Sequence, residues 1–139
     1  MYIYLTSSGS KTFFSDNEPS SFRIKLSRPL IFSGLWEIAL TQLTIPTFKT
    51  GYSPQYIDIY TSSSSESLLN DTEAQILNRV FLSEITTQQC LRFTRPYYIH
   101  LNTGQLNLLD IHLLDDTGAK PSFASGDLYC TLHLRRCLS

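Results

Sequence analysis

Apolar and polar side chains alternate with a period of two along the last third of the chain. The pattern is clearest in residues 106–114 and 128–135. Because successive side chains of a strand point to opposite faces of a sheet, this period predicts two β-strands with one buried and one solvated face. Ile111 and Leu132 fall on faces that we expect to be buried, whereas Asp110 falls on a face that we expect to be solvated.

Six earlier segments also have strand character: residues 1–5, 22–26, 35–45, 56–60, 90–93 and 97–101. The first is expected to pair at a sheet edge. The third is apolar on both faces for part of its length, which is typical of a strand at the centre of a sheet or sandwich. Alternate side chains of the second and third segments should form facing layers of the core: Phe22, Ile24 and Leu26, with Trp36, Ile38 and Leu40.

One stretch, residues 73–82, is ambiguous. The apolar pairs that begin at Ile76 and at Val80 are about one helical turn apart, so we expect a short helix or an irregular connection there. Glycine should supply the turns at three other boundaries: Gly34, Gly118 and Gly126. Seven or eight strands with at most one short helix favour an antiparallel β-sandwich or barrel.

Length and composition narrow the functional classes. A chain of 139 residues should form one domain, residues 1–139, and 42% hydrophobic residues with only 17% charged residues indicate an ordered fold whose neutral Ser/Thr surface suits protein contacts. A net charge of −1 gives no reason to expect nucleic-acid binding.

No apolar run approaches the roughly 20 residues needed to span a bilayer, and a signal peptide is not recognisable. The three cysteines are interpreted as reduced thiols, buried as small hydrophobes, in an intracellular product.

Asp116-Thr117-Gly118-Ala119 matches the signature of aspartic proteases, in which two Asp residues share one proton across a dimer axis. In that architecture the motif lies near the start of the fold, whereas only about twenty residues follow it here. We therefore favour a β-turn over residues 115–118, with Gly118 at positive φ.

No other catalytic or metal-binding motif stands out in the sequence. His100, His112 and His133 fall at polar-facing or boundary positions of predicted strands, and they could bind zinc only if those strands were adjacent. They lack a short-spaced pair, and the cysteines lack a Cys-x-x-Cys spacing, so we interpret them as solvent-facing residues. Phosphate loops and nucleophile motifs are also missing, and the tyrosines are assigned to core edges and subunit contacts. We expect neither a cofactor, nor a metal, nor an enzymatic activity.

Several segments share a further pattern: Asn-Glu-Pro-Ser-Ser-Phe-Arg-Ile-Lys-Leu at 17–26, Pro-Leu at 29–30, Gly-Leu-Trp-Glu-Ile-Ala-Leu-Thr at 34–41, Asp-Asp-Thr-Gly at 115–118, Phe-Ala-Ser-Gly at 123–126 and Leu-Tyr-Cys-Thr-Leu-His-Leu-Arg at 128–135. Together they resemble the small jelly-roll proteins of Polinton (Maverick) elements and adintovirus-like DNA viruses, which are associated with minor-capsid or penton-like roles. The likeness covers both ends of the chain, roughly half of it, and is poor between residues 50 and 89.

The resemblance implies an all-β, antiparallel sandwich of jelly-roll type in a viral structural protein. Such a protein is made in the cytoplasm or nucleus of the host cell and is found in the virion. Its partners would be itself, as a homo-oligomer such as a pentamer, and other capsid proteins, with no membrane contact. We expect the subunit contacts to come from Tyr52 and from a loop tip of four serines: Ser62, Ser63, Ser64 and Ser65. An attachment module of the same sandwich class, binding a receptor or glycan, is the first alternative, and a dimeric aspartic protease is the disfavoured second.

Overall fold

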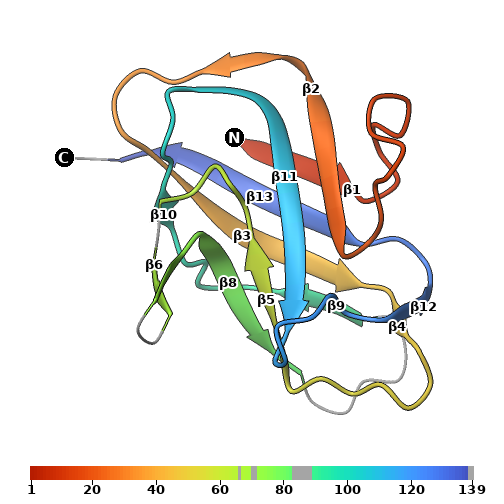
Figure 1. Ribbon diagram of the computed structural model, residues 1–139. Helices are drawn as coiled ribbons and strands as arrows, with labels where there is room; N and C mark the ends of the chain where they lie inside the picture. The colour runs from red at the N-terminus through yellow and green to blue at the C-terminus, as the bar shows by residue number, and fades with distance from the viewer. Residues whose placement is uncertain (66, 70–71, 83–88, 138–139) are drawn as a thin grey trace.

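The computed structural model of the chain describes residues 1–65, 67–69, 72–82 and 89–137, and in this part it contains β-strands and no helix. Two antiparallel sheets face each other (Figure 1). One sheet has five strands: β1 (Tyr2–Thr6), β13 (Tyr129–Arg136), β3 (Trp36–Ile45), β10 (Ile99–His100) and β9 (Gln89–Arg92). The other has four: β2 (Ser21–Ile31), β11 (Gln105–Asp115), β5 (Tyr56–Tyr60) and β8 (Ile76–Phe81). The predicted all-β sandwich is confirmed.

Two small sheets lie beside the sandwich. One pairs β4 (Thr47–Phe48) with β12 (Phe123–Ser125), and the other pairs β6 (Ser67–Leu69) with β7 (Thr72–Ala74). In the first, the rings of Phe48 and Phe123 stack with centroids 5.3 Å apart. This small sheet therefore covers one end of the sandwich with aromatic side chains.

The strands of the two main sheets pair in a nested order. The first strand along the chain pairs with the last, β1 with β13, and the second pairs with the last but one, β2 with β11. Farther in, β3 pairs with β9 and β10, and β5 pairs with β8. The predicted position of β1 at a sheet edge and of β3 at a sheet centre are both confirmed.

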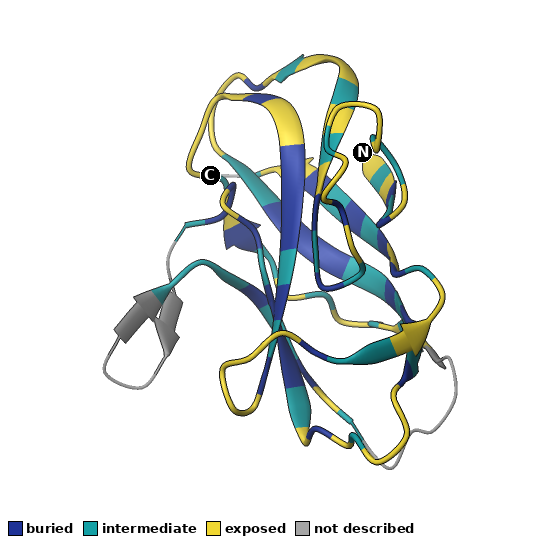
Figure 2. Ribbon diagram, turned by 45° about the vertical axis from the view of Figure 1, so that its right-hand side comes forward, coloured by how far each residue is buried: buried dark blue, intermediate teal, exposed yellow. Residues whose placement is uncertain are grey.

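The core lies between the two sheets (Figure 2), and most of the residues predicted for it are buried there. Five are fully enclosed: Phe22, Ile38, Leu40, Ile111 and Leu132. Each large apolar side chain removed from water in this way contributes on the order of 1.5–3 kcal/mol to folding. Three more, Ile24, Leu26 and Trp36, are only partly buried and pack against the margin of the core, because β2 lies at the edge of its sheet and Trp36 begins its strand.

The helix or irregular connection expected in residues 73–82 is wrong. Residues 76–81 form β8, which pairs with β5 along its length. The register shifts there: Asn78 lies opposite Ile59, and Ile76 lies opposite Tyr60, so Leu77 is an extra residue in β8. Such a bulge interrupts the period of two, and it lets Leu77 and Val80, three residues apart, both point into the core.

Glycine takes a positive φ at the three predicted turns, Gly34, Gly118 and Gly126, with φ of 82°, 83° and 97°. At Gly126 the space is also limited, because a Cβ would lie 3.3 Å from the Cβ of Pro46. The turn predictions are thus confirmed. No helix in the described part of the chain is long and apolar enough to cross a membrane.

Candidate functional site

The serine loop that follows β5 is not the exposed contact tip that the sequence predicts. Only Ser62 is exposed; Ser63 and Ser64 have 6% and 0% of their surface accessible, and Ser65 is half-buried. The Ser65 backbone nitrogen donates to the carbonyl of His100, and the Asn102 side chain donates to the carbonyls of Ser62 and Ser64. The loop is therefore packed against the chain around β10, and most of it cannot meet a neighbouring subunit.

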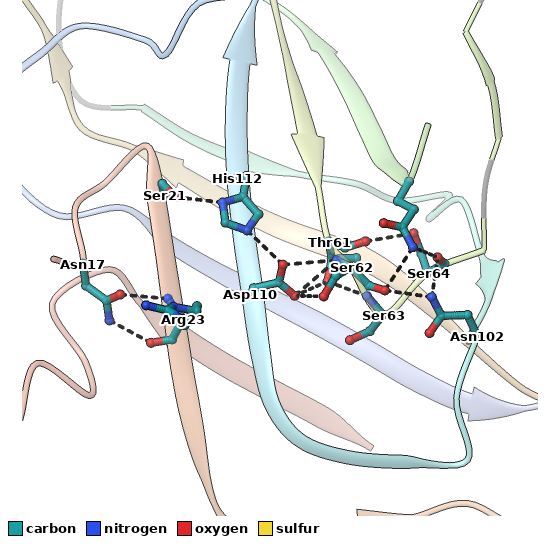
Figure 3. Close-up of polar contacts among 11 residues, drawn as sticks. Asn17, Ser21, Arg23, Thr61, Ser62, Ser63, Ser64, Asn102, Asp110 and His112 are labelled. Atoms are coloured by element: carbon teal, nitrogen blue, oxygen red, sulfur yellow. Dashed lines mark hydrogen bonds and ion pairs between the residues drawn. The ribbon is translucent and has the colours of Figure 1, made fainter. Parts of the chain in front are cut away.

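Asp110 of β11 holds this loop through hydrogen bonds to its side chain (Figure 3). Its carboxylate accepts a hydrogen bond of 2.6 Å from the Ser62 hydroxyl, others of 3.2 Å from the Ser62 backbone nitrogen, and a longer one from the Thr61 hydroxyl. The prediction that Asp110 is solvated is wrong, since only 5% of its surface is accessible. It does lie on the polar face of β11, but the serine loop covers that face at Asp110.

The same carboxylate ends a row of three polar groups, Ser21, His112 and Asp110. His112 Nε2 lies 2.9 Å from Asp110, and its Nδ1 lies 2.8 Å from the Ser21 hydroxyl. Because a carboxylate only accepts, Nε2 carries the proton, and in the neutral ring Nδ1 accepts from Ser21. Nucleophilic catalysis would also need a substrate cleft and oxyanion donors. Four pockets on the described surface are lined by other residues, so we interpret the row as a structural link between β2 and the serine loop.

Tyr52, the other predicted contact residue, is also engaged inside the protein. It packs against Phe48, and its hydroxyl donates to Asp115 at 2.5 Å. Burial and the Asp115 carboxylate raise the Tyr52 pKa above its ordinary range. Tyr52 is half-buried and its hydroxyl is already bonded within the protein. Its role as a subunit contact stays a prediction.

Asp115 anchors the turn that carries the protease-like motif. The Gly118 nitrogen donates to the Asp115 carbonyl at 3.0 Å, which confirms the predicted β-turn. Burial alone would raise the pKa of the Asp115 carboxyl. Hydrogen bonds from the hydroxyls of Thr117 and Tyr52 and from the backbone nitrogens of Thr117 and Ala119 outweigh it and lower that pKa to about 2. Asp116, the residue that would be catalytic, is exposed on the turn.

Three tyrosines cluster on the outer face of the five-stranded sheet, along its β1 edge. Tyr2, Tyr4 and Tyr129 are 58%, 77% and 44% exposed. In the β1–β13 register Tyr2 lies opposite His133, and the two rings meet at a tilt with centroids 4.4 Å apart. Tyr4 lies opposite Thr131, diagonal to Tyr129. Diagonal neighbours on one face are within reach of aromatic side chains. We call these three side chains the tyrosine face. The sequence assigned tyrosines to contacts in general, but only the register identifies these three.

Two of the three histidines lie apart from each other in the fold. His112 lies in the four-stranded sheet, and His133 lies beside the tyrosine face, where burial lowers its pKa. The three thiols are free, and only Cys130 is buried, so the expectation that all three are buried is wrong: Cys90 is exposed and Cys137 half-buried.

One mixed cluster was missed by the sequence. Glu37, His100 and Cys137 line a pocket of about 430 Å³ together with Arg135 and Arg136. Arg135 Nε donates to Glu37 at 2.5 Å, and its guanidinium lies 3.5 Å from the centroid of the Tyr98 ring. Burial and the Glu37 carboxylate raise the Cys137 pKa. These residues are far apart in the sequence and become neighbours because β3 pairs with β10 and β13. Their spacing along the chain does not reveal that pairing.

Comparison with known proteins adds no relative to this picture. The sequence matches no protein-family model, and no curated protein matches it significantly.

Proposed function

We propose that this protein is a structural subunit of a viral coat that acts by self-assembly and by contacts with other coat proteins, as a minor-capsid or penton-like component. The resemblance of its terminal segments to the small jelly-roll proteins of Polinton elements and adintovirus-like viruses motivates the proposal. Because one fold hosts many functions, the argument must rest on the surface as well as on the architecture.

The nested strand order supports the jelly-roll part of the proposal. A jelly roll is a long hairpin of eight strands rolled into two facing sheets, so that strand one pairs with eight, two with seven, three with six and four with five. When β9 and β10 are counted as one interrupted strand, the pairs β1–β13, β2–β11, β3–β9/β10 and β5–β8 follow that scheme.

The observation that carries the contact role is the tyrosine face. Tyrosine supplies a large, rigid contact area and a polar tip, and it is enriched at protein–protein interfaces. Here three such side chains are exposed along one sheet edge, Tyr2, Tyr4 and Tyr129, where β1 has a described strand partner on one side only, β13. A neighbouring subunit that covers this edge would bury the aromatic rings and shield the strand edge at once.

The chemistry of the turn at residues 115–118 fits a structural role better than the protease alternative. Asp116 is exposed, and its one described hydrogen bond is a long contact of 3.5 Å from the Gln55 backbone nitrogen. Asp115, the buried member of the pair, has its carboxylate occupied by hydrogen bonds within its own turn and from Tyr52. A buried carboxylate that holds its own turn in this way is a structural anchor.

The contact role is tested by sedimentation velocity on the double variant Tyr4→Ser/Tyr129→Ser. We expect the wild-type protein to sediment as an oligomer and the variant to dissociate at roughly tenfold or more higher concentrations, because central interface tyrosines each contribute on the order of 1–2 kcal/mol or more. Phe81→Ser is the matched control: Phe81 is 73% exposed on the edge strand of the other sheet, and its loss should leave assembly unchanged. An unchanged oligomer in the double variant would contradict the contact role. Glycan binding by a protein that does not assemble would favour the attachment alternative.

A further inference from the structure

Strand pairing brings three different metal-binding side chains together at one end of the five-stranded sheet. Glu37 of β3 lies directly opposite His100 of β10 on one side and opposite Arg135 of β13 on the other. Cys137 follows β13, and its backbone nitrogen donates to the Leu35 carbonyl at 2.8 Å, which extends the pairing past the strand. The backbone thus holds a carboxylate, an imidazole and a thiol at the same pocket.

The donor atoms have distances that suit a tetrahedral ion. With zinc–sulfur and zinc–nitrogen bonds of about 2.3 and 2.0 Å, a tetrahedral angle separates the sulfur and nitrogen by about 3.5 Å. The Cys137 sulfur lies 3.5 Å from His100 Nδ1. A Glu37 carboxylate oxygen lies within 4.8 Å of both, and rotation of this long side chain would bring it to bonding distance.

The surroundings favour zinc over a hard cation. Calcium and magnesium prefer sites built from oxygen donors, whereas a thiolate, an imidazole and a carboxylate are all zinc ligands. Two arginines line the pocket, which would disfavour a cation bound by charge alone. Arg135, however, is held by Glu37 and by the ring of Tyr98, and it is placed to act as an outer partner of the carboxylate once Glu37 binds the ion.

We propose that Glu37, His100 and Cys137 form a zinc site that keeps its fourth position open to water or to a group from outside this set. The ion would join the end of β13 to β3 and β10, and so fasten the last described residues of the chain to the centre of the sheet. Binding of this kind stabilises the folded protein, because the three ligands are far apart in the unfolded chain. The inference is independent of the coat role.

The test is metal binding by the purified full-length chain, stripped of metal and kept reduced. Zinc is titrated against a chromophoric chelator, and cobalt is added separately as a spectroscopic probe. We expect one equivalent of zinc to bind and to raise the thermal unfolding midpoint. Cobalt should give a sulfur-to-metal charge-transfer band together with the d–d bands of a four-coordinate ion.

Loss of a residue that only supports a metal ligand typically weakens metal binding by about 10–100-fold. Cys137→Ser and His100→Asn remove ligands themselves and should weaken zinc binding by more than this. Cys137→Ser should also lose the charge-transfer band. Both side chains are partly or fully exposed, and circular dichroism checks that the variants fold. Cys90→Ser removes the other accessible thiol and should change nothing. The proposal is overturned if wild-type protein fails to bind zinc at micromolar concentration, if Cys137→Ser binds it as well as wild type, or if Cys90→Ser is the variant that loses the cobalt band.

Discussion

The carboxylate of Asp110 lies 2.6 Å from the hydroxyl oxygen of Ser62 and 3.2 Å from its backbone nitrogen. One buried side chain of β11 thus holds the loop that follows β5, and the same carboxylate accepts from His112 on its other side. This arrangement covers the outer face of the four-stranded sheet at Asp110 only, since Phe81 of the same sheet is 73% exposed; the opposite sheet carries the three exposed side chains of the tyrosine face.

Asp110→Asn should destabilise the protein by about 1–3 kcal/mol, the usual cost of leaving a buried polar group without its partner. The amide nitrogen that replaces one oxygen is a donor, and it would face the Ser62 or His112 donors. The free energy of unfolding in urea measures the loss. Asp116→Asn is the control and should change stability by less than about 0.5 kcal/mol, because Asp116 is exposed. Equal effects of the two substitutions would contradict the role given to Asp110.

Asp115 should make the protein sensitive to acid in a defined range. Its pKa is about 2 in the folded protein, held down by hydrogen bonds that outweigh its burial, and about 3.9 in an unfolded chain. A carboxyl whose pKa is lowered by folding contributes stability above its unfolded pKa, and that stability is lost as the pH falls from about 4 to 2. The contribution is about 2.5 kcal/mol.

Urea unfolding at a series of pH values between about 5 and 2 measures this contribution, which should be missing from the pH profile of Asp115→Asn. Asp116→Asn should keep the wild-type profile. If Asp115→Asn lost stability with acid as steeply as the wild type, the low pKa of Asp115 would be disproved.

The three thiols should react with a disulfide reagent in a fixed order at mildly alkaline pH. Cys90 is exposed, and hydrogen bonds from Thr44 and Gln42 lower its pKa, so it should react first. Burial raises the pKa of Cys137 and, to about 12, that of Cys130. We expect Cys137 to react slowly and Cys130 only after unfolding. Mass spectrometry of the labelled peptides gives the order, and early labelling of Cys130 would show that the core is more open than described.

Gly118→Ala should cost about 1–2 kcal/mol, because its φ of 83° places an L residue in the left-handed region. Nothing lies within 4 Å of the added Cβ, so the cost is conformational and not steric. Gly104→Ala is the matched control. Its φ is not positive, and the added Cβ would make only an ordinary contact at 3.8 Å, so stability should stay unchanged or rise slightly. Thermal unfolding compares the two, and an unaffected Gly118→Ala would remove the conformational argument for this turn.

Strands that alternate regularly were predictable from the sequence. In β13 the buried positions Cys130, Leu132 and Leu134 keep the period of two. The prediction failed at β8, because the extra residue Leu77 shifts the alternation and produces a spacing that imitates a helix. A bulge is set by the partner strand, and pattern along one segment cannot report it.

The candidate sites were harder to predict than the strands, because their residues are brought together by strand pairing between distant parts of the chain. Serines in a row are typical of an exposed loop, and nothing local to Ser62 or Ser64 shows that Asp110 binds the first and that Asn102 donates to the second. The zinc ligands likewise become neighbours only through the registers of β3 with β10 and β13. The sequence pointed to polar and metal-binding residue types, but only the tertiary structure shows which of these residues are in contact.

Light scattering across a concentration series, which gives the absolute mass of the wild-type protein in solution, tests the coat-subunit proposal most directly. A coat subunit that assembles through its tyrosine face should form a discrete closed oligomer larger than a dimer, with a mass that is a whole multiple of the 15.8 kDa chain. A pentamer would support the penton-like role in particular. A mass of one chain at every concentration would contradict self-assembly, and a stable dimer would return the protease alternative to consideration.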